Sequence, residues 1–499
     1  MKNIAIYLIM LLLPFNLTAQ ALLDNEEISS AENYESLLQA LDTPELVYSL
    51  NIRGYNLTSL PDEFTQLVNL QELNLSINPA LNYAEVFRTL SQLKSLQKLT
   101  ISLNNIEELP DELGLLTQIR ELDISGNNFK ELPSSFEKLT NLEKLNLSEL
   151  RNLDLEQAFK TLSKCGKLKS LSLSFNYRYE IPAAIGLLEN LEELSLRKNR
   201  LSSLPAEFSK LKKLKVLSLK GNRFEYIPQQ ITEFKLLEKF DISQNYLLEL
   251  NPELSKLKFL YDLDLSENTD LDIEQTFQTL PQFPALKELT IANCNLAYIP
   301  AEIGKLHSLE VLSLWKNQLT VLPEEIGNLK NLKILSLWQN KLISLPEEIG
   351  QLSNLEKIFL WKNNLNTLPS SIGKLVNLKQ LYLSDNEIVV LPNEIANLTK
   401  LELVTLSNNQ LTQLPEEICN LTNLRTLYLV ENELNRLPRE ISRLQNLEEL
   451  NLSSNQLKSL PVEISQLPSL QILNIELNMF SQSEQTLILE MLPNTQVYY

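Results

Sequence analysis

The sequence predicts an α/β solenoid, in which a parallel β-sheet forms one face and short helices or 3₁₀ turns form the other. The first observation is a period: residues 309–377 consist of three successive 23-residue segments that begin LEVLSLWKNQL, LKILSLWQNKL and LEKIFLWKNNL. Self-similarity at a fixed period of about 20–50 residues is typical of stacked repeats. The second and third observations are the strand-like LxxLxL pattern that opens each segment and the helix-compatible LPxxIGxL pattern that follows it.

The first half of each repeat predicts a short strand. Side chains alternate along a strand, so the leucines at positions four and six enter the core while positions five and seven point outward. Equivalent strands would lie about 4.8 Å apart in a parallel sheet. The ninth position is usually Asn, which we expect to turn the chain inward and to hydrogen-bond the backbone of adjacent turns. Leu150 replaces this Asn in one repeat, which predicts an irregular turn there.

The second half of each repeat predicts the convex side. The Pro of LPxxI has no N–H group and suits the first turn of a short helix. Three repeats have 26 residues instead of 23 and start at Leu70, Leu142 and Leu260. They contain the related segments LNYAEVFRTL, LDLEQAFKTL and LDIEQTFQTL, which predict longer α-helices. A dedicated binding site on the convex side is the alternative reason for these insertions.

The combined pattern LxxLxLxxNxLxxLPxxIGxLxx resembles the leucine-rich repeat family in its 23-residue form. The resemblance extends over residues 47–480 and about 19 repeats, with the 26-residue variants starting at 70, 142 and 260. It implies a right-handed, horseshoe-shaped leucine-rich-repeat solenoid with the parallel sheet on the concave face. It also implies a function in binding proteins along that sheet.

The two ends of the chain depart from the repeat. Residues 1–21 are predicted to be a signal peptide, with Lys2, an apolar run from Ile4 to Leu13 and a small-residue cleavage site. This run is too short to span a bilayer, so we expect no membrane span and a secreted, periplasmic or cell-surface protein. Residues 22–46 are predicted to form a helical N-terminal cap, since Tyr34, Leu37, Leu38 and Leu41 share one face at helical spacing. Residues 481–499 are predicted to form a C-terminal cap with a last helix and an edge strand.

The composition argues against several functions. The formal net charge is −19, whereas nucleic-acid binding requires basic surface, so no nucleic-acid partner is expected. The sole histidine, His307, precedes a predicted strand as a surface turn residue, and the chain has no GxSxG, glycine-rich phosphate loop or HExxH motif. We therefore predict no enzyme and no cofactor. The three cysteines have no metal or redox spacing and are expected to be free thiols.

The candidate site lies at the outward positions of the predicted concave sheet. Position seven is Ser in most repeats, but three consecutive repeats place there the only tryptophans of the chain. Neighbouring strands would bring these rings into one stacked ladder, and an exposed apolar patch of several hundred Å² usually marks a binding site. Aromatic residues at position five extend the ladder, and two lysines flank it. The predicted ligand-binding residues are Trp315, Trp338, Trp361, Phe359, Tyr382, Tyr428, Lys316 and Lys362.

The tryptophan ladder could also exist without a ligand. The Trp could have been copied with the repeat during duplication, or the rings could stack on one another for stability. We predict a non-catalytic scaffold that recognises a protein partner, because aromatic anchors are typical interface hot spots. A secreted glycan-binding protein or adhesin is the first alternative, since ring ladders can stack on sugars. An intracellular signalling scaffold of the Ras-group repeat type is the second alternative if the signal peptide is not real.

Overall fold

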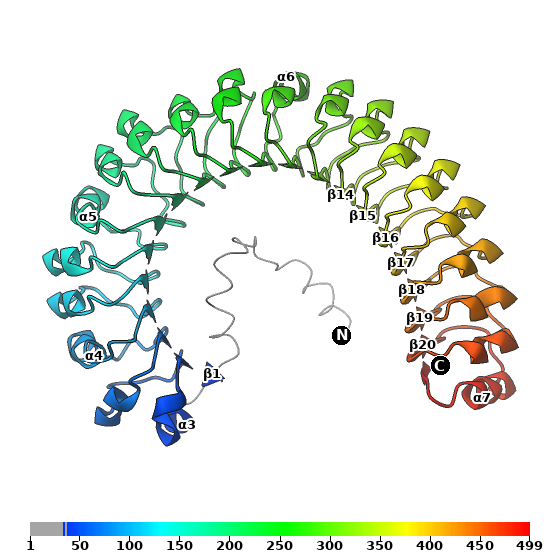
Figure 1. Cartoon of the computed structure of the whole chain (residues 1–499), viewed down its shortest axis with the longest axis horizontal. Helices are drawn as coiled ribbons and strands as arrows, with labels where there is room; N and C mark the ends of the chain where they lie inside the picture. Colours follow the sequence, from blue (N-terminus) through cyan, green and yellow to red (C-terminus); the bar gives the residue numbers. More distant parts are fainter. Residues whose placement is uncertain (1–32, 35–36) are drawn as a thin grey trace. The chain divides into compact units, whose positions relative to one another are not determined.

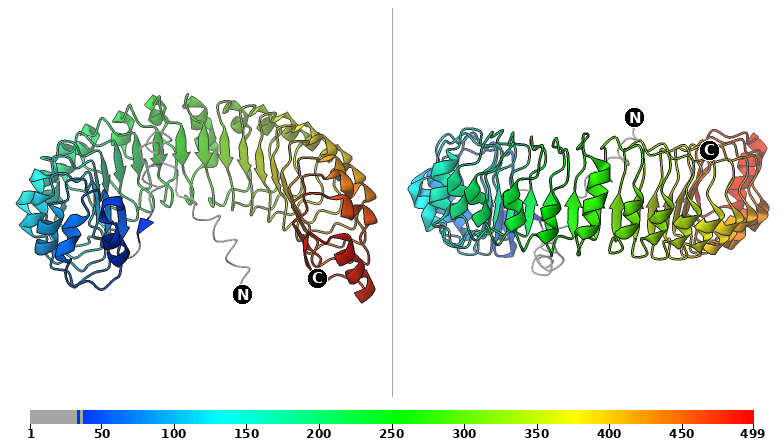
Figure 2. Two further views of the ribbon diagram at one scale, coloured as in Figure 1. Left: turned by 60° about the horizontal axis from the view of Figure 1, so that its bottom comes forward. Right: turned by 90° about the horizontal axis from the view of Figure 1, so that it is seen from above.

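The computed structural model describes residues 33–34 and 37–499. The predicted signal peptide lies outside the described residues. The contacts divide the chain into two compact units. The first unit extends to Asn199 and includes Pro205–Leu211, and the second comprises Arg200–Leu204 and Lys212–Tyr499. In each unit the strands lie side by side along one face and the helical segments along the opposite face (Figure 1). Figure 2 shows the same layering from two further sides.

The strands are parallel and hydrogen-bonded in sequence order within each unit, as the repeat pattern predicts. The strands of the first unit are β1 (Asn33–Tyr34), β2 (Ser49–Asn51), β3 (Glu72–Asn74), β4 (Lys98–Thr100), β5 (Glu121–Asp123), β6 (Lys144–Asn146), β7 (Ser170–Ser172) and β8 (Glu193–Ser195). Those of the second unit are β9 (Val216–Ser218), β10 (Lys239–Asp241), β11 (Asp262–Asp264), β12 (Glu288–Thr290), β13 (Val311–Ser313), β14 (Ile334–Ser336), β15 (Lys357–Phe359), β16 (Gln380–Tyr382), β17 (Leu403–Thr405), β18 (Thr426–Tyr428), β19 (Glu449–Asn451), β20 (Ile472–Asn474) and β21 (Gln496–Tyr498).

The strand register keeps equivalent repeat positions side by side. Leu312, Leu335 and Ile358, all at position four, are paired across β13, β14 and β15 and are fully buried. The leucines at position six, such as Leu337, are fully buried as well. Within a unit the core therefore runs as a continuous apolar column between the sheet and the helical layer, because each repeat buries its apolar face only against its neighbours.

Most repeats close with a 3₁₀ helix. The 3₁₀ helices of the first unit are η1 (Pro44–Leu46), η2 (Asp62–Gln66), η3 (Asp111–Leu115), η4 (Ser134–Lys138), η5 (Ala183–Leu187) and η6 (Ala206–Lys210). Those of the second unit are η7 (Gln229–Glu233), η8 (Pro252–Lys256), η9 (Leu280–Gln282), η10 (Ala301–Lys305), η11 (Glu324–Asn328), η12 (Glu347–Gln351), η13 (Ser370–Lys374), η14 (Asn393–Asn397), η15 (Glu416–Asn420), η16 (Arg439–Arg443) and η17 (Val462–Gln466).

The Pro of LPxxI lies just before these 3₁₀ helices, one residue earlier than predicted. Pro346 has extended backbone angles (φ −69°, ψ 153°) and caps η12, and its carbonyl accepts a hydrogen bond from the Ile349 N–H at 3.1 Å. The residue therefore sets the entry angle of the 3₁₀ helix instead of lying in its first turn.

The three 26-residue repeats contain α-helices, as predicted. These are α4 (Tyr83–Leu90), α5 (Leu155–Leu162) and α6 (Ile273–Thr279), and their central phenylalanines Phe87, Phe159 and Phe277 are fully buried. Each α-helix begins after an Asn or Asp whose side chain accepts a hydrogen bond from a backbone N–H of the first turn.

The ninth-position asparagines form the expected ladder. Asn340 is 8% exposed, and its Nδ2 donates to the carbonyls of Leu314 (3.0 Å) and Leu337 (2.9 Å). Its Oδ1 accepts from the Leu319 N–H at 3.1 Å. One side chain thus joins two neighbouring repeats through backbone groups of both.

The irregular turn predicted at Leu150 is not present. Glu149, just before it, has φ 59° and donates its N–H to the Ser174 carbonyl at 2.9 Å, as Gln339 does with φ 57° and the Trp361 carbonyl at 2.9 Å. The Leu150 N–H donates to Oδ1 of Asn176, the ninth-position Asn of the next repeat, so this neighbouring side chain supports the turn that Leu150 itself cannot. Leu150 is fully buried, and the guanidinium Nη2 of Arg178 donates to its carbonyl.

A second row of asparagines, which the sequence pattern did not reveal, occupies the last position of many repeats. Asn331, Asn354 and Asn377 donate through Nδ2 to the carbonyls of His307, Lys330 and Ser353, each at 2.8 Å. Asn331 and Asn354 are exposed and Asn377 is half-buried, whereas asparagines of the ninth-position ladder such as Asn340 are buried. The repeats are consequently tied together both inside the sheet turn and on the surface.

The two ends of the described chain carry further elements. Tyr34 lies in strand β1, and helix α3 (Leu37–Asp42) begins after it, so the prediction that Tyr34 shares a helical face with Leu37 is wrong. Helix α7 (Gln482–Met491) buries Ile488 and strand β21 pairs with β20. The function of the two ends as caps stays a prediction.

Candidate functional site

The predicted tryptophan ladder is present on the concave face of the second unit. Trp315, Trp338 and Trp361 follow strands β13, β14 and β15 two residues after each strand ends. The ring centroids of Trp315 and Trp338 lie 4.7 Å apart at an interplanar angle of 4°, and those of Trp338 and Trp361 lie 4.5 Å apart at 5°. The ring spacing matches the strand spacing because each ring occupies the same position of a hydrogen-bonded strand. All three side chains are partly buried.

A second pair of rings lies beside the ladder. Phe359 and Tyr382 are register partners on β15 and β16, with ring centroids 4.7 Å apart at 14°. Tyr428 lies on β18, two strands beyond Tyr382, and Thr405 of β17 occupies the register position between them. The structure therefore brings together five of the six predicted aromatic residues and separates Tyr428. Burial raises the pKa of Tyr428, and a hydrogen bond to Glu449 raises it further.

The stacking determines which part of each ring is available. Both faces of Trp338 are covered, one by Trp315 and the other by Trp361. Lys362 Nζ lies 5.1 Å from the ring centroid of Trp361 in a cation–π contact. The ladder thus presents mainly ring edges to solvent, and the edge of an aromatic ring carries the positive end of its quadrupole.

The charged residues near the ladder fall into two groups. At position two of the repeats, lysines and glutamates pair across strands: Lys287 and Lys333 both contact Glu310, at 2.9 and 2.6 Å, and Lys379 contacts Glu356 at 2.8 Å. These hydrogen bonds to lysine lower the pKa of both glutamates. The charges of this row therefore largely cancel one another.

The second group of charged residues belongs to a surface made of the outward positions of β13, β14 and β15 together with the residue after each Trp. These twelve positions are Val311, Ser313, Trp315, Lys316, Ile334, Ser336, Trp338, Gln339, Lys357, Phe359, Trp361 and Lys362. They include three lysines and no carboxylate, and Lys316 and Lys362 are exposed. We call this surface the ladder floor. It is a local positive area in a chain of formal net charge −19.

The floor of the neighbouring strands β10, β11 and β12 has the opposite charge. Asp241 and Asp264 are register partners, and Asp264 Oδ1 accepts hydrogen bonds from the Ser266 N–H (2.9 Å) and Oγ (2.6 Å). Burial, followed by the charge of Asp241, raises the pKa of Asp264 to about 6. Asp262 pairs with Lys239 at 3.2 Å, and Glu288 is the third-position residue of the next strand. The concave face of this unit thus changes from acidic to basic within three strands.

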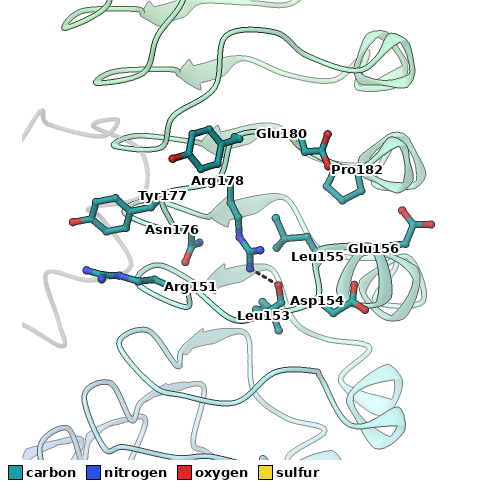
Figure 3. A pocket seen from close by; sticks show the side chains of 11 residues that line it. Arg151, Leu153, Asp154, Leu155, Glu156, Asn176, Tyr177, Arg178, Glu180 and Pro182 are labelled. Atoms are coloured by element: carbon teal, nitrogen blue, oxygen red, sulfur yellow. Dashed lines mark hydrogen bonds between the residues drawn. The ribbon is translucent and has the colours of Figure 1, made fainter.

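Another candidate site is a cavity of about 500 Å³ in the first unit, at the loops around Arg151 and Arg178 (Figure 3). Arg178 occupies the position at which most repeats have a buried Leu, and its Nη2 donates to the carbonyls of Leu150 and Leu153. Burial lowers the pKa of Arg178. Charged residues of both signs line the cavity, including Arg151 and Glu156. We attribute this cavity to the support of a 26-residue repeat, since its central guanidinium is bound to that repeat's backbone.

Metal-ligating side chains do not cluster in the described part of the chain. No group of three or more His, Cys, Asp and Glu side chains in residues 33–34 and 37–499 could hold a metal ion. Cys165, Cys294 and Cys419 are free and buried, and burial raises the pKa of the Cys294 thiol to about 12. The helices of this part are all too short or too polar to cross a membrane.

Comparisons with known proteins agree with this architecture. The family model described as leucine-rich repeat region matches residues 324–429 and 362–497. The model described as leucine rich repeat matches residues 94–152, 166–224 and 284–342. A solved leucine-rich repeat protein of Leptospira interrogans is 32% identical over 94% of this chain and 100% of that chain, with a TM-score of 0.56. The chain belongs to the leucine-rich repeat family.

Two further leucine-rich repeat structures share the fold at lower identity. The TLR13–ssRNA13 complex is 23% identical over 88% of this chain and 79% of that chain, with a TM-score of 0.56. The Toll–Spatzle complex of Drosophila is 22% identical over 86% of this chain and 57% of that chain, with a TM-score of 0.58. No match was found among curated proteins. Leucine-rich repeat proteins generally serve as protein-binding scaffolds, and the fold is typically non-catalytic.

Proposed function

We propose that this leucine-rich repeat protein is a non-catalytic scaffold that recognises a protein partner on the concave face of its second unit. The aromatic residues Trp315, Trp338, Trp361, Phe359 and Tyr382 would form the centre of the interface. Lys316, Lys362 and Tyr428 would contact the partner at its margins. The observation that carries the proposal is the row of three large rings at a repeat position that is Ser in most other repeats.

Physical arguments favour a protein over a sugar as the ligand of the tryptophan ladder. Carbohydrate-binding ladders use open ring faces, whereas here the faces of Trp338 are covered by its two neighbours. Ring edges, Val311 and Ile334 instead form a mixed apolar and donor-rich surface, which suits the backbone and side chains of a protein segment. Large aromatic residues at the centre of an interface can each contribute 2 kcal/mol or more, on the order of typical hot spots.

The stack of rings also contributes to the stability of the fold, so the same rings would both stabilise the protein and bind the partner. Each stacked ring pair is worth about 0.5–1.5 kcal/mol beyond its buried area. Serine at position 338 would therefore cost stability as well as binding, although Ser is the usual residue at this position of the repeat. Any test of binding must for this reason compare folded protein at the same concentration.

Affinity capture with the mature protein tests the proposal. The wild type, Trp338→Ser and Ser125→Ala should each be immobilised in equal folded amounts and exposed to extracellular proteins and, in parallel, to a glycan array. We expect a protein that is retained by the wild type and by Ser125→Ala, a concave position of the first unit, but not by Trp338→Ser. Equal retention by all three variants, or binding to glycans alone, would refute the assignment.

We also propose that the protein is exported, on the basis of Lys2, the apolar run Ile4–Leu13 and the small-residue cleavage site. N-terminal sequencing of the protein after cell fractionation should find a mature start near residue 22 outside the cytoplasm. An intact Met1 on cytoplasmic protein would contradict export and would favour the intracellular signalling scaffold.

A further inference from the structure

The ladder floor differs in charge from the surfaces on both sides of it. It carries Lys316, Lys357 and Lys362 without a carboxylate. The outward positions of β10, β11 and β12 and the residue after each seventh position include one lysine, Lys239, which pairs with Asp262, and five carboxylates: Asp241, Asp262, Asp264, Glu267 and Glu288. On the other side, the residues equivalent to Lys362 in two of the next three repeats are Asp385 and Glu431. A ligand carboxylate is therefore attracted to the ladder floor and repelled by its surroundings.

The lysines of the ladder floor do not take part in the row of ion pairs beside it. Glu310 and Glu356 accept from Lys287, Lys333 and Lys379, which all belong to position two. Lys316 and Lys362 lie at position eight, at the opposite end of the strand, and their side chains are exposed. Both have left-handed backbone angles, φ 60° and 57°, which the repeat imposes at this position in every turn of this region.

The stacked rings favour the same kind of ligand. Their exposed edges carry the positive end of the ring quadrupole, so they attract oxygen atoms and repel cations. A cationic group would instead require an open ring face, and the faces of Trp338 are covered. Ring edges and lysines thus have the same electrostatic preference.

We propose that the ligand of the ladder floor is a short acidic protein segment, with apolar side chains against the rings and one or two Asp or Glu side chains near Lys316 and Lys362. This inference rests on the proposed function and adds the chemical class of the partner. A nucleic acid would also bring negative charge, but it would extend past three strands onto the acidic floor of β10–β12, where its phosphates would be repelled. The acidic neighbours thus limit the anionic part of the ligand to a few residues.

Selection from a random dodecapeptide display library tests this inference on the full-length protein. Peptides that bind the wild type should be enriched in Asp and Glu together with Leu, Ile, Val or aromatic residues. The matched variant is Lys316→Gln combined with Lys362→Gln. The middle repeat already has Gln339 at the equivalent position with φ 57°, so this double variant should fold.

A peptide chosen from the wild-type selection, with a fluorescent label, then provides the measurement. Its affinity for the double variant should be about 2- to 30-fold weaker, the range for two exposed ion pairs. The affinity should also change less with NaCl concentration in the double variant than in the wild type. A range of roughly 50–300 mM NaCl is suitable, because such concentrations screen exposed ion pairs. Trp338→Ser should abolish the binding of this peptide.

The outcomes separate the two proposals. Enrichment of basic or uncharged peptides that still need Trp338 would overturn the acidic ligand and leave the protein-binding platform intact. Unchanged affinity and salt dependence in the double variant would do the same. Peptides that bind Trp338→Ser as well as the wild type, or no enriched peptide at all, would reject the platform and with it the acidic ligand. Displacement of the peptide by a single-stranded RNA of similar length would identify a nucleic-acid ligand and overturn the inference.

Discussion

Replacement of Asn340 by Ala should lower the free energy of unfolding by about 1–3 kcal/mol, and the structure shows where this cost arises. The Leu314 carbonyl also accepts from Asn317 Nδ2 at 2.9 Å, and the Leu337 carbonyl also accepts from Asn363 Nδ2 at 3.0 Å. Both carbonyls consequently keep a donor in the variant. The Leu319 N–H, in contrast, loses Asn340 Oδ1, and Leu319 is fully buried. The cost of one unpaired buried N–H group therefore dominates.

Two measurements check this prediction. Denaturant unfolding gives the loss of stability, and hydrogen exchange of the Leu319 amide gives a local value that does not assume two-state unfolding of a repeat array. Asn331→Ala is the matched control, because this exposed Asn donates a single hydrogen bond, to the His307 carbonyl at 2.8 Å. It should cost about 0.5 kcal/mol. A loss for Asn340→Ala no larger than that of the control, with slow Leu319 exchange, would refute the reasoning.

Three further predictions concern the stack, the acidic floor and the thiols. Trp338→Ser removes two stacked ring pairs and should lower stability by about 1–3 kcal/mol in denaturant unfolding; an unchanged midpoint would show that the rings do not stack in solution. The pKa of Asp264 in the folded state is raised to about 6 from 3.8, so its ionised form destabilises the folded protein above pH 6. This loss of stability disappears as the pH falls toward 4 and the carboxyl becomes protonated. Asp264→Asn, which Asn146 shows can accept the same Ser N–H and Oγ bonds, should therefore add roughly 1–2 kcal/mol at pH 7 and little at pH 4, and equal gains at both pH values would contradict this. Iodoacetamide at about pH 8 should leave Cys294 unmodified in folded protein and modify it in denaturant, since its thiol pKa is raised to about 12; rapid modification of native protein would contradict its burial.

Most of the fold could be predicted from the sequence because the same residue pattern recurs in every repeat. Leucine periodicity predicted the strands, and the inserted LDLEQAFKTL-type segments predicted the α-helices. The prediction at Leu150 was wrong because the side chain at position nine was assumed to determine the turn. The turn depends instead on the left-handed residue before it, here Glu149, and on Asn176 of the next repeat, whose Oδ1 accepts the Leu150 N–H.

The position of the candidate site could be predicted from the sequence, but the part of each ring that is exposed to solvent could not. Strand alternation placed Trp315, Trp338 and Trp361 in one row, and the structure confirms that they stack. Whether ring faces or ring edges meet solvent depends on side-chain rotamers, which the sequence does not state. The separation of Tyr428 from the other rings follows from a single small residue, Thr405, whose effect appears only when the strand register is known.

The ninth-position ladder gives the array a polarity. Each Asn accepts the buried N–H of the preceding repeat, as Asn340 does for Leu319 and Asn363 does for Leu342. Of the ladder's own hydrogen bonds, loss of a repeat from the N-terminal end would leave only side-chain groups of the next Asn without a protein partner, its Oδ1 and one Nδ2–H, and water can satisfy both. Loss of a repeat from the C-terminal end would leave a backbone N–H of the new last repeat without its acceptor. Fragments that share the same number of repeats should therefore differ in solubility and stability according to which end was shortened, and a useful minimal binder would keep everything that follows the tryptophans.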